Sequence, residues 1–245
     1  MYSKTENTEK MVDDKESVNG YVSIDEWVEK LYNWEEENAL NLEYPESLLD
    51  YYVFPKNKND LKNLKKLHIC GYVDSRRIPI ALKNGIPKEI GELSNLRQLV
   101  IAVSDIVTIP KEIGNLINLY HLEIDSCSEL VCLPKEIFNL NYLTSFSIRM
   151  TKINKFPKEI GSFPHLLELT LCENGIIKLP DEITNLKSLR ILNIDLNPNL
   201  LFTKKQEEWL NELEEQGCDI SINAYLEDAS SKKLEIILDQ DDIPW

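Results

Sequence analysis

The chain has 245 residues, of which 42% are hydrophobic and 28% charged, and its formal net charge is −15. It contains no run of 18 apolar residues, which excludes a membrane-spanning helix, and its polar first 20 residues lack the apolar core of a secretory signal. The five cysteines are odd in number and scattered without CxxC spacing, so we expect reduced thiols, no disulfide, no metal site and a cytoplasmic protein.

The negative charge is concentrated at the two ends of the chain. Residues 1–60 carry a net charge of −9 and residues 201–245 a net −8, whereas residues 61–200 carry +2. Acidic ends repel phosphate backbones and anionic lipid, so we expect neither a nucleic-acid partner nor a membrane partner. Acidity that serves solubility alone is the other interpretation of the same charges.

The first elements in chain order are a tail and a helix. Residues 1–20 are polar, acidic and without periodicity, which predicts a disordered acidic tail. Within residues 21–54 we expect an N-terminal helical cap whose helix runs from a capping box at Ser23 and Glu26 to about Asn38. Its apolar stripe would cover the first repeat, or else dock a partner; the stripe consists of Ile24, Trp27, Val28, Leu31 and Trp34.

The middle of the chain is an internal repeat. Five prolines recur every 23 residues, with one interval of 24, each followed by a leucine-rich pattern; they are Pro87, Pro110, Pro134, Pro157 and Pro180. A fixed period of this length indicates one structural unit stacked on copies of itself. The pattern predicts six repeats over residues 55–200, and each proline would begin a short helix.

The first turn of this array is longer than the others. Ile78-Pro79 stands at the expected repeat distance after Pro55, but Ile86-Pro87 follows only eight residues later. We therefore predict an insertion near residues 70–86. It forms either a binding loop or a neutral extension.

Each repeat also predicts a short strand in a parallel sheet, with alternate side chains pointing outward to a concave face. The small residues after the strands, such as Cys127 and Asn174, would turn inward and bond backbone groups. Either the outward side chains form salt bridges along an idle sheet, with Asp125 close enough to pair with Arg149, or they bind a partner with some basic character. The candidate partner-binding residues are Gln98, His121, Glu123, Asp125, Ser145, Ser147, Arg149, Glu168, Thr170, Asn193 and Asp195.

The repeat pattern ends after Leu200. Residues 201–222 predict a C-terminal cap, in which Thr203 begins a helix that Gly217 ends and residues 218–222 form a last strand. Residues 223–245 are an acidic tail that either folds back onto this cap or serves as a recognition peptide.

The repeats resemble leucine-rich repeat proteins of the LxxLxLxxNxLxxLPxxIxxLxx type, as found in bacterial and plant-like intracellular members. Leu166, Leu169, Leu171, Asn174 and Ile176 show the pattern, and Tyr72 departs from it where Asn is expected. The resemblance covers about residues 55–222. It implies an α/β leucine-rich repeat solenoid, with a curved parallel sheet on the concave side and short helices on the convex side, that binds other proteins.

We therefore expect a monomeric, non-enzymatic module that binds a protein or peptide, as yet unidentified, on the concave face. No phosphate-binding, nucleophile-elbow or zinc-protease motif occurs, so no catalytic, cofactor or metal residue is predicted. One alternative is an exported effector or surface protein that binds host proteins through the same face. Another is a structural subunit that docks through its caps or its C-terminal tail.

Overall fold

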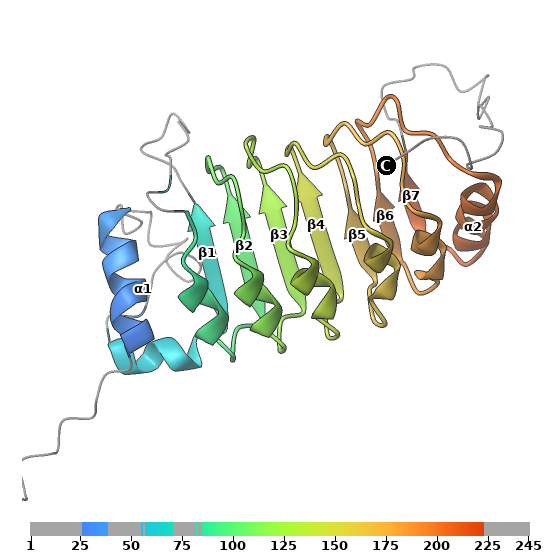
Figure 1. Cartoon of the computed structure of the whole chain (residues 1–245). Helices are drawn as coiled ribbons and strands as arrows, with labels where there is room; N and C mark the ends of the chain where they lie inside the picture. The colour runs from blue at the N-terminus through green and yellow to red at the C-terminus, as the bar shows by residue number, and fades with distance from the viewer. Residues whose placement is uncertain (1–25, 39–54, 56, 71–81, 83–84, 223–245) are drawn as a thin grey trace, which may run out of the picture.

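The computed structural model describes residues 26–38, 55, 57–70, 82 and 85–222. Within these residues, seven strands form one parallel sheet in sequence order, so that each strand pairs with its neighbours in the sequence (Figure 1). The strands are β1 (Lys66–Cys70), β2 (Gln98–Ala102), β3 (His121–Asp125), β4 (Ser145–Arg149), β5 (Glu168–Thr170), β6 (Ile191–Asn193) and β7 (Asp219–Ser221).

Short 3₁₀ helices form a second layer, which lies on one side of the sheet (Figure 1). They are η2 (Lys58–Asn63), η3 (Lys88–Glu92), η4 (Lys111–Asn115), η5 (Lys135–Asn139), η6 (Lys158–Ser162) and η7 (Asp181–Asn185). The repeat proline precedes each of the last five and holds the extended backbone from which the helix begins, as at Pro110 with φ −65°. These short convex helices are tighter than α-helices.

The core lies between the sheet and the 3₁₀ row. Strand positions alternate, so that Leu122 and Ile124 are fully buried while their neighbours in β3 face outward. The isoleucine of each PKEI or PDEI segment closes the core from the opposite side, and Ile113 and Ile160 are fully buried. Each repeat contributes the same few positions, so one continuous apolar core runs the length of the sheet.

An α-helix lies at each end of the described array (Figure 1). Helix α1 (Glu26–Glu37) buries Val28, Leu31 and Trp34, and the Trp34 indole N–H donates to the Gly85 carbonyl at 2.7 Å. These are three members of the predicted stripe; the capping residue Ser23 and the stripe residue Ile24 lie outside the described residues.

Helix α2 (Lys204–Glu215) begins after Thr203, the residue predicted to cap its N-terminus. The Thr203 hydroxyl accepts from the Gln206 backbone N–H at 3.3 Å, and the Gln206 side chain accepts from the Thr203 N–H at 3.1 Å. Its Trp209 indole N–H donates to the Leu186 carbonyl at 3.2 Å, which fixes the helix against the last repeat. Gly217 follows with φ +81°, as predicted for the residue that ends the helix.

Most of the predicted insertion, like both acidic tails, lies outside the described residues. Between the first two strands Lys66 pairs with Gln98, whereas Gln98 pairs with His121 after a shorter interval of chain. Leu82 and Ile86 are described at the end of this stretch, and both are buried. No helix in the described part of the chain is long and apolar enough to cross a membrane.

Candidate functional site

The outward side chains of the sheet form straight columns, because successive repeats pair without a register shift. We call this surface the concave face. Its first column contains Lys66, Gln98, His121, Ser145, Glu168, Ile191 and Asp219, and its second contains His68, Val100, Glu123, Ser147, Thr170, Asn193 and Ser221. The third column begins with Cys70, Ala102, Asp125 and Arg149.

The solvent exposure of these side chains varies along the sheet. Arg149 and Glu168 are exposed, and Ile191 is an exposed apolar side chain beside Glu168 in the first column. Most of the other candidate residues, from Gln98 to Asn193, are half-buried by their neighbours in the columns. Among the candidate residues the exposed charges are therefore Arg149 and Glu168, and the columns also carry exposed charges at their two ends, Lys66 in β1 and Asp219 in β7.

Glu123 is the centre of a small charged group. The Glu123 carboxylate lies 3.5 Å from Nε2 of His121. The hydrogen bond from His121 lowers the pKa of Glu123, with help from the charges of His121, His68 and Arg149 and against the effect of burial. Burial lowers the pKa of His68 to about 4, so this histidine is neutral at pH 7. Glu123 thus keeps its negative charge.

The structure does not show the ion pair that was expected between Asp125 and Arg149. The two residues are register partners on β3 and β4, but no ion pair joins them within the described residues. Asp125 instead accepts a hydrogen bond at 3.2 Å from Ser126, in the left-handed turn that follows β3. Arg149 therefore remains open to solvent, and the sheet is not closed there by a salt-bridge ladder.

The expectation that the Asp195 side chain is exposed on the concave face was also wrong. It is only 8% exposed, and its carboxylate accepts a hydrogen bond from the Ser221 hydroxyl. Strand β6 ends at Asn193, whose side-chain oxygen accepts a hydrogen bond from the Asp195 backbone N–H at 3.1 Å. Cys172 is buried at the equivalent place after β5. The third column is consequently accessible only at Asp125 and Arg149.

The small residues after the strands turn inward and form a buried ladder, as predicted. Asn197 is fully buried, and its Nδ2 donates to the Leu171 carbonyl at 2.8 Å while its Oδ1 accepts from the Ile176 N–H at 3.0 Å. In the repeat before, Asn174 Oδ1 accepts from the Thr151 hydroxyl at 2.7 Å. These side chains satisfy backbone groups at the bend, so their role is structural.

The described cysteines and acidic residues show no metal-binding arrangement. Within residues 26–38, 55, 57–70, 82 and 85–222, no three His, Cys, Asp or Glu side chains are grouped to hold an ion. Cys70, Cys127, Cys172 and Cys218 are buried, Cys132 is exposed, and none of the five is in a disulfide within the described residues. Burial raises the pKa of Cys127, Cys172 and Cys218, which keeps these thiols protonated and unreactive at neutral pH.

Sequence analysis missed one surface feature, a cleft on the convex side between η5 and η6. The available signal was Phe138, which stands where three other repeats have Gly91, Gly114 and Gly161. The cleft shares no residue with the concave face, because its lining comes from the 3₁₀ row and the turn after η5.

The 23-residue repeat, the unshifted parallel sheet, the 3₁₀ helix after each proline and the buried asparagine ladder define one class of protein. The chain has the fold of a leucine-rich repeat solenoid.

Comparison of the structure with solved structures finds proteins with leucine-rich repeats. A leucine-rich repeat protein of Leptospira interrogans is 28% identical over 70% of this chain and 46% of its own, with a TM-score of 0.48. The internalin InlF of Listeria monocytogenes is 15% identical over 78% of this chain and 59% of its own, at 0.43. The leucine-rich repeat domain of the type III effector XopL is 18% identical over 82% and 90%, at 0.40.

This chain spans only about half the length of the first two of these structures. No family model and no curated protein matches its sequence.

Proposed function

We propose that the protein is a non-enzymatic binding module whose concave face holds a protein or peptide segment of basic character. The observation that carries this proposal is the open, unpaired charge at β4 and β5, where Arg149 and Glu168 are exposed. A sheet whose charges were matched to one another would have no such side chains left for a partner.

The sign of the charge supports a basic partner. Among the outward strand positions described, Glu123, Asp125, Glu168 and Asp219 are acidic, whereas Lys66 and Arg149 are basic. An acidic surplus steers cationic segments toward the face and raises the rate of association more than the final affinity. The exposed Ile191 beside Glu168 supplies an apolar contact for the same segment.

The proposal of a non-enzymatic role is supported by the chemistry of the face. His68 is neutral, the described Cys172 thiol is buried and protonated, and Glu123 is held by His121. None of these pairs a nucleophile with a base.

The test is a comparative pull-down from native lysate with purified variants. The concave variant combines Glu123→Lys, Asp125→Lys and Arg149→Glu, and circular dichroism checks that it folds. A control with the same change in net charge combines Glu92→Lys, Glu214→Lys and Lys111→Glu, which are exposed and lie off the sheet. We expect one partner to be captured by wild type and by the control but not by the concave variant, and to bind less tightly as salt increases.

A partner that both variants retain would refute the concave site. Deletion of residues 223–245 then tests docking through the C-terminal tail, because loss of the partner on deletion alone identifies a structural subunit instead.

A further inference from the structure

Neighbouring 3₁₀ helices pack closely because a glycine stands at their contact. A Cβ atom added to Gly91 would lie 2.4 Å from the Glu112 carbonyl oxygen, and one added to Gly161 would lie 1.9 Å from that of Glu182. Gly114 meets Glu136 in the same way, at 2.6 Å. These distances leave no room for a side chain, so the glycines set the spacing of the helix row.

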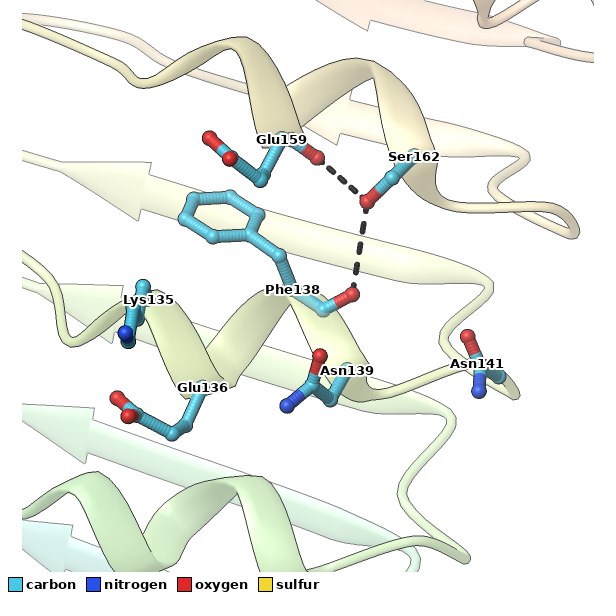
Figure 2. Close-up of a pocket in the computed structure, with 7 residues that line it drawn as sticks. All are labelled: Lys135, Glu136, Phe138, Asn139, Asn141, Glu159 and Ser162. Atoms are coloured by element: carbon cyan, nitrogen blue, oxygen red, sulfur yellow. Dashed lines mark hydrogen bonds between the residues drawn. The ribbon is translucent and has the colours of Figure 1, made fainter.

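In η5 this position is Phe138. Its Cβ cannot take the glycine position against η6, and its ring instead packs inward at 5.6 Å from the ring of Phe163. Phe163 in turn contacts Phe146 at 5.5 Å in an edge-on arrangement, so the benzyl group is anchored in the core. A cleft is found between η5 and η6, and its lining includes Phe138 (Figure 2).

The cleft has a volume of about 450 Å³ and an uneven lining. The Ser162 hydroxyl donates to the Glu159 carbonyl at 2.6 Å and bridges to the Phe138 carbonyl at 3.5 Å, which ties the two helices together at one end (Figure 2). Glu136 of η5 and Glu159 of η6 carry carboxylates on its two sides, and Asn139 adds an amide. Its volume lies toward the lower end of the range for ligand-binding clefts and is large enough for one long side chain.

The carboxylates of this cleft have no counter-charge within bonding distance. In the described part of the chain neither Glu136 nor Glu159 takes part in an ion pair, and the exposed Lys135 at the edge pairs with neither. Elsewhere the same structure does form such pairs, as between Lys152 and Glu129 at 2.9 Å. Two carboxylates around an apolar floor complement a cation with a flat, weakly hydrated head.

We propose that this convex cleft receives an arginine side chain of a partner protein. A guanidinium carries five N–H donors in a planar fork, which suits carboxylate and amide oxygens arranged around it. Its methylene stem and weakly hydrated head also suit a partly apolar lining better than a compact, strongly hydrated ammonium does. The site is independent of the concave face and exists whether or not that face binds a partner.

The test titrates the ¹⁵N-labelled full chain with N-acetyl-arginine amide and, as a neutral analogue of the same shape, N-acetyl-citrulline amide. We expect saturable shifts of the Asn139 and Ser162 resonances with the arginine compound only. Glu159→Gln should weaken binding about fivefold or more, because it removes one charge-assisted contact, and Lys135→Gln should tighten binding by removing a like charge. Glu182→Gln, the equivalent carboxylate of η7, is the matched control and should leave binding unchanged.

Phe138→Gly introduces the glycine that three other repeats have at this position, should let η5 and η6 approach, and should abolish binding. Absence of saturable shifts in wild type, equal binding of the citrulline compound, or an unchanged affinity in Glu159→Gln would overturn the proposal. The Glu159→Gln result stands even if Phe138→Gly does not fold, and a concave variant such as Glu168→Gln should bind the compound as wild type does.

Discussion

Asn197 accepts a hydrogen bond at 3.2 Å from the backbone N–H of Asn174, the residue at the same position one repeat earlier. Its side-chain nitrogen donates to the Leu171, Ile194 and Asp195 carbonyls at 2.8, 2.9 and 3.1 Å. One fully buried amide therefore links the bends of two successive repeats.

Replacement of this amide should be costly. Asn197→Ala leaves several buried backbone groups without a partner, so we expect the free energy of unfolding to fall by about 3 kcal/mol. Chemical denaturation measures the change, and Asn115→Ala, at an exposed position in η4, should change it by less than about 0.5 kcal/mol. Equal effects of the two changes would show that the ladder does not stabilise the bend.

A β-branched residue occupies a left-handed conformation after β2. Val103 has φ +46°, and Ser126, Met150, Glu173 and Leu196 adopt the same conformation after the next strands. Asparagine tolerates this region much better than valine, so Val103→Asn should stabilise the fold by about 1 kcal/mol. A thermal melt measures it beside Val107→Asn, an exposed control. A lower melting temperature for Val103→Asn than for the control would contradict the strain at this turn.

Replacement of two glycines compares the cost of a steric clash, at Gly161, with the cost of a strained backbone conformation, at Gly175. Gly161→Ala brings a Cβ to within 1.9 Å of the Glu182 carbonyl oxygen, and the displacement of η6 from η7 should cost about 3 kcal/mol. Gly175 has φ +71° and open space around it, so Gly175→Ala should cost only about 1 kcal/mol of conformational strain. Denaturant titration of both variants measures the difference, and a larger effect at Gly175 would refute the close contact of the helix row.

His68 should make the fold sensitive to acid. Its pKa in the folded protein is about 4, lower than its ordinary value of 6.5, because burial disfavours the charged ring more than Glu123 favours it. Between these two pH values the unfolded chain binds a proton that the folded chain does not, so stability is full above pH 6.5 and decreases as the pH falls toward 4. After allowance for solvent screening, we expect a loss of about 2 kcal/mol at pH 4.

His68→Gln should remove this part of the pH dependence, whereas His165→Gln, at an exposed position, should keep it. Denaturation at pH 7 and pH 4.5 measures both. Parallel curves for wild type and His68→Gln would show that the histidine titrates normally.

Much of the fold could be predicted because the chain repeats its own spacing. Gln98, His121 and Ser145 are separated by the same intervals of 23 and 24 residues as Pro87, Pro110 and Pro134. This spacing places the three side chains in one column, and the observed pairing has that register. The inward turn of Asn174 and Asn197 was predictable as well, since a small residue stands at this position in each of the five repeats from Ser104 to Asn197.

The spacing could not predict how deeply an individual side chain is buried or which group it bonds. Asp195 has the period of an outward residue, yet the hydrogen bond from Ser221 and the end of β6 bury it. The register of Asp125 and Arg149 fitted an ion pair, but a hydroxyl one residue away takes the carboxylate. The convex cleft depends on one exception to the pattern, Phe138, whose consequence appears only when two helices are packed together.

The buried ladder is chemically graded along the molecule. At its C-terminal end two carboxamides bond backbone groups at 2.8 to 3.2 Å, whereas toward its other end the Cys127 thiol makes the longer and weaker contacts of sulfur, to the Ser104 hydroxyl at 3.5 Å and to the Asp125 and Ile101 carbonyls at 3.4 and 3.7 Å. Because each repeat is stabilised only by its neighbours, local unfolding starts most readily where these links are weakest. We therefore expect local unfolding to begin in the N-terminal repeats and to reach the strands that carry Glu168 and Ile191 last.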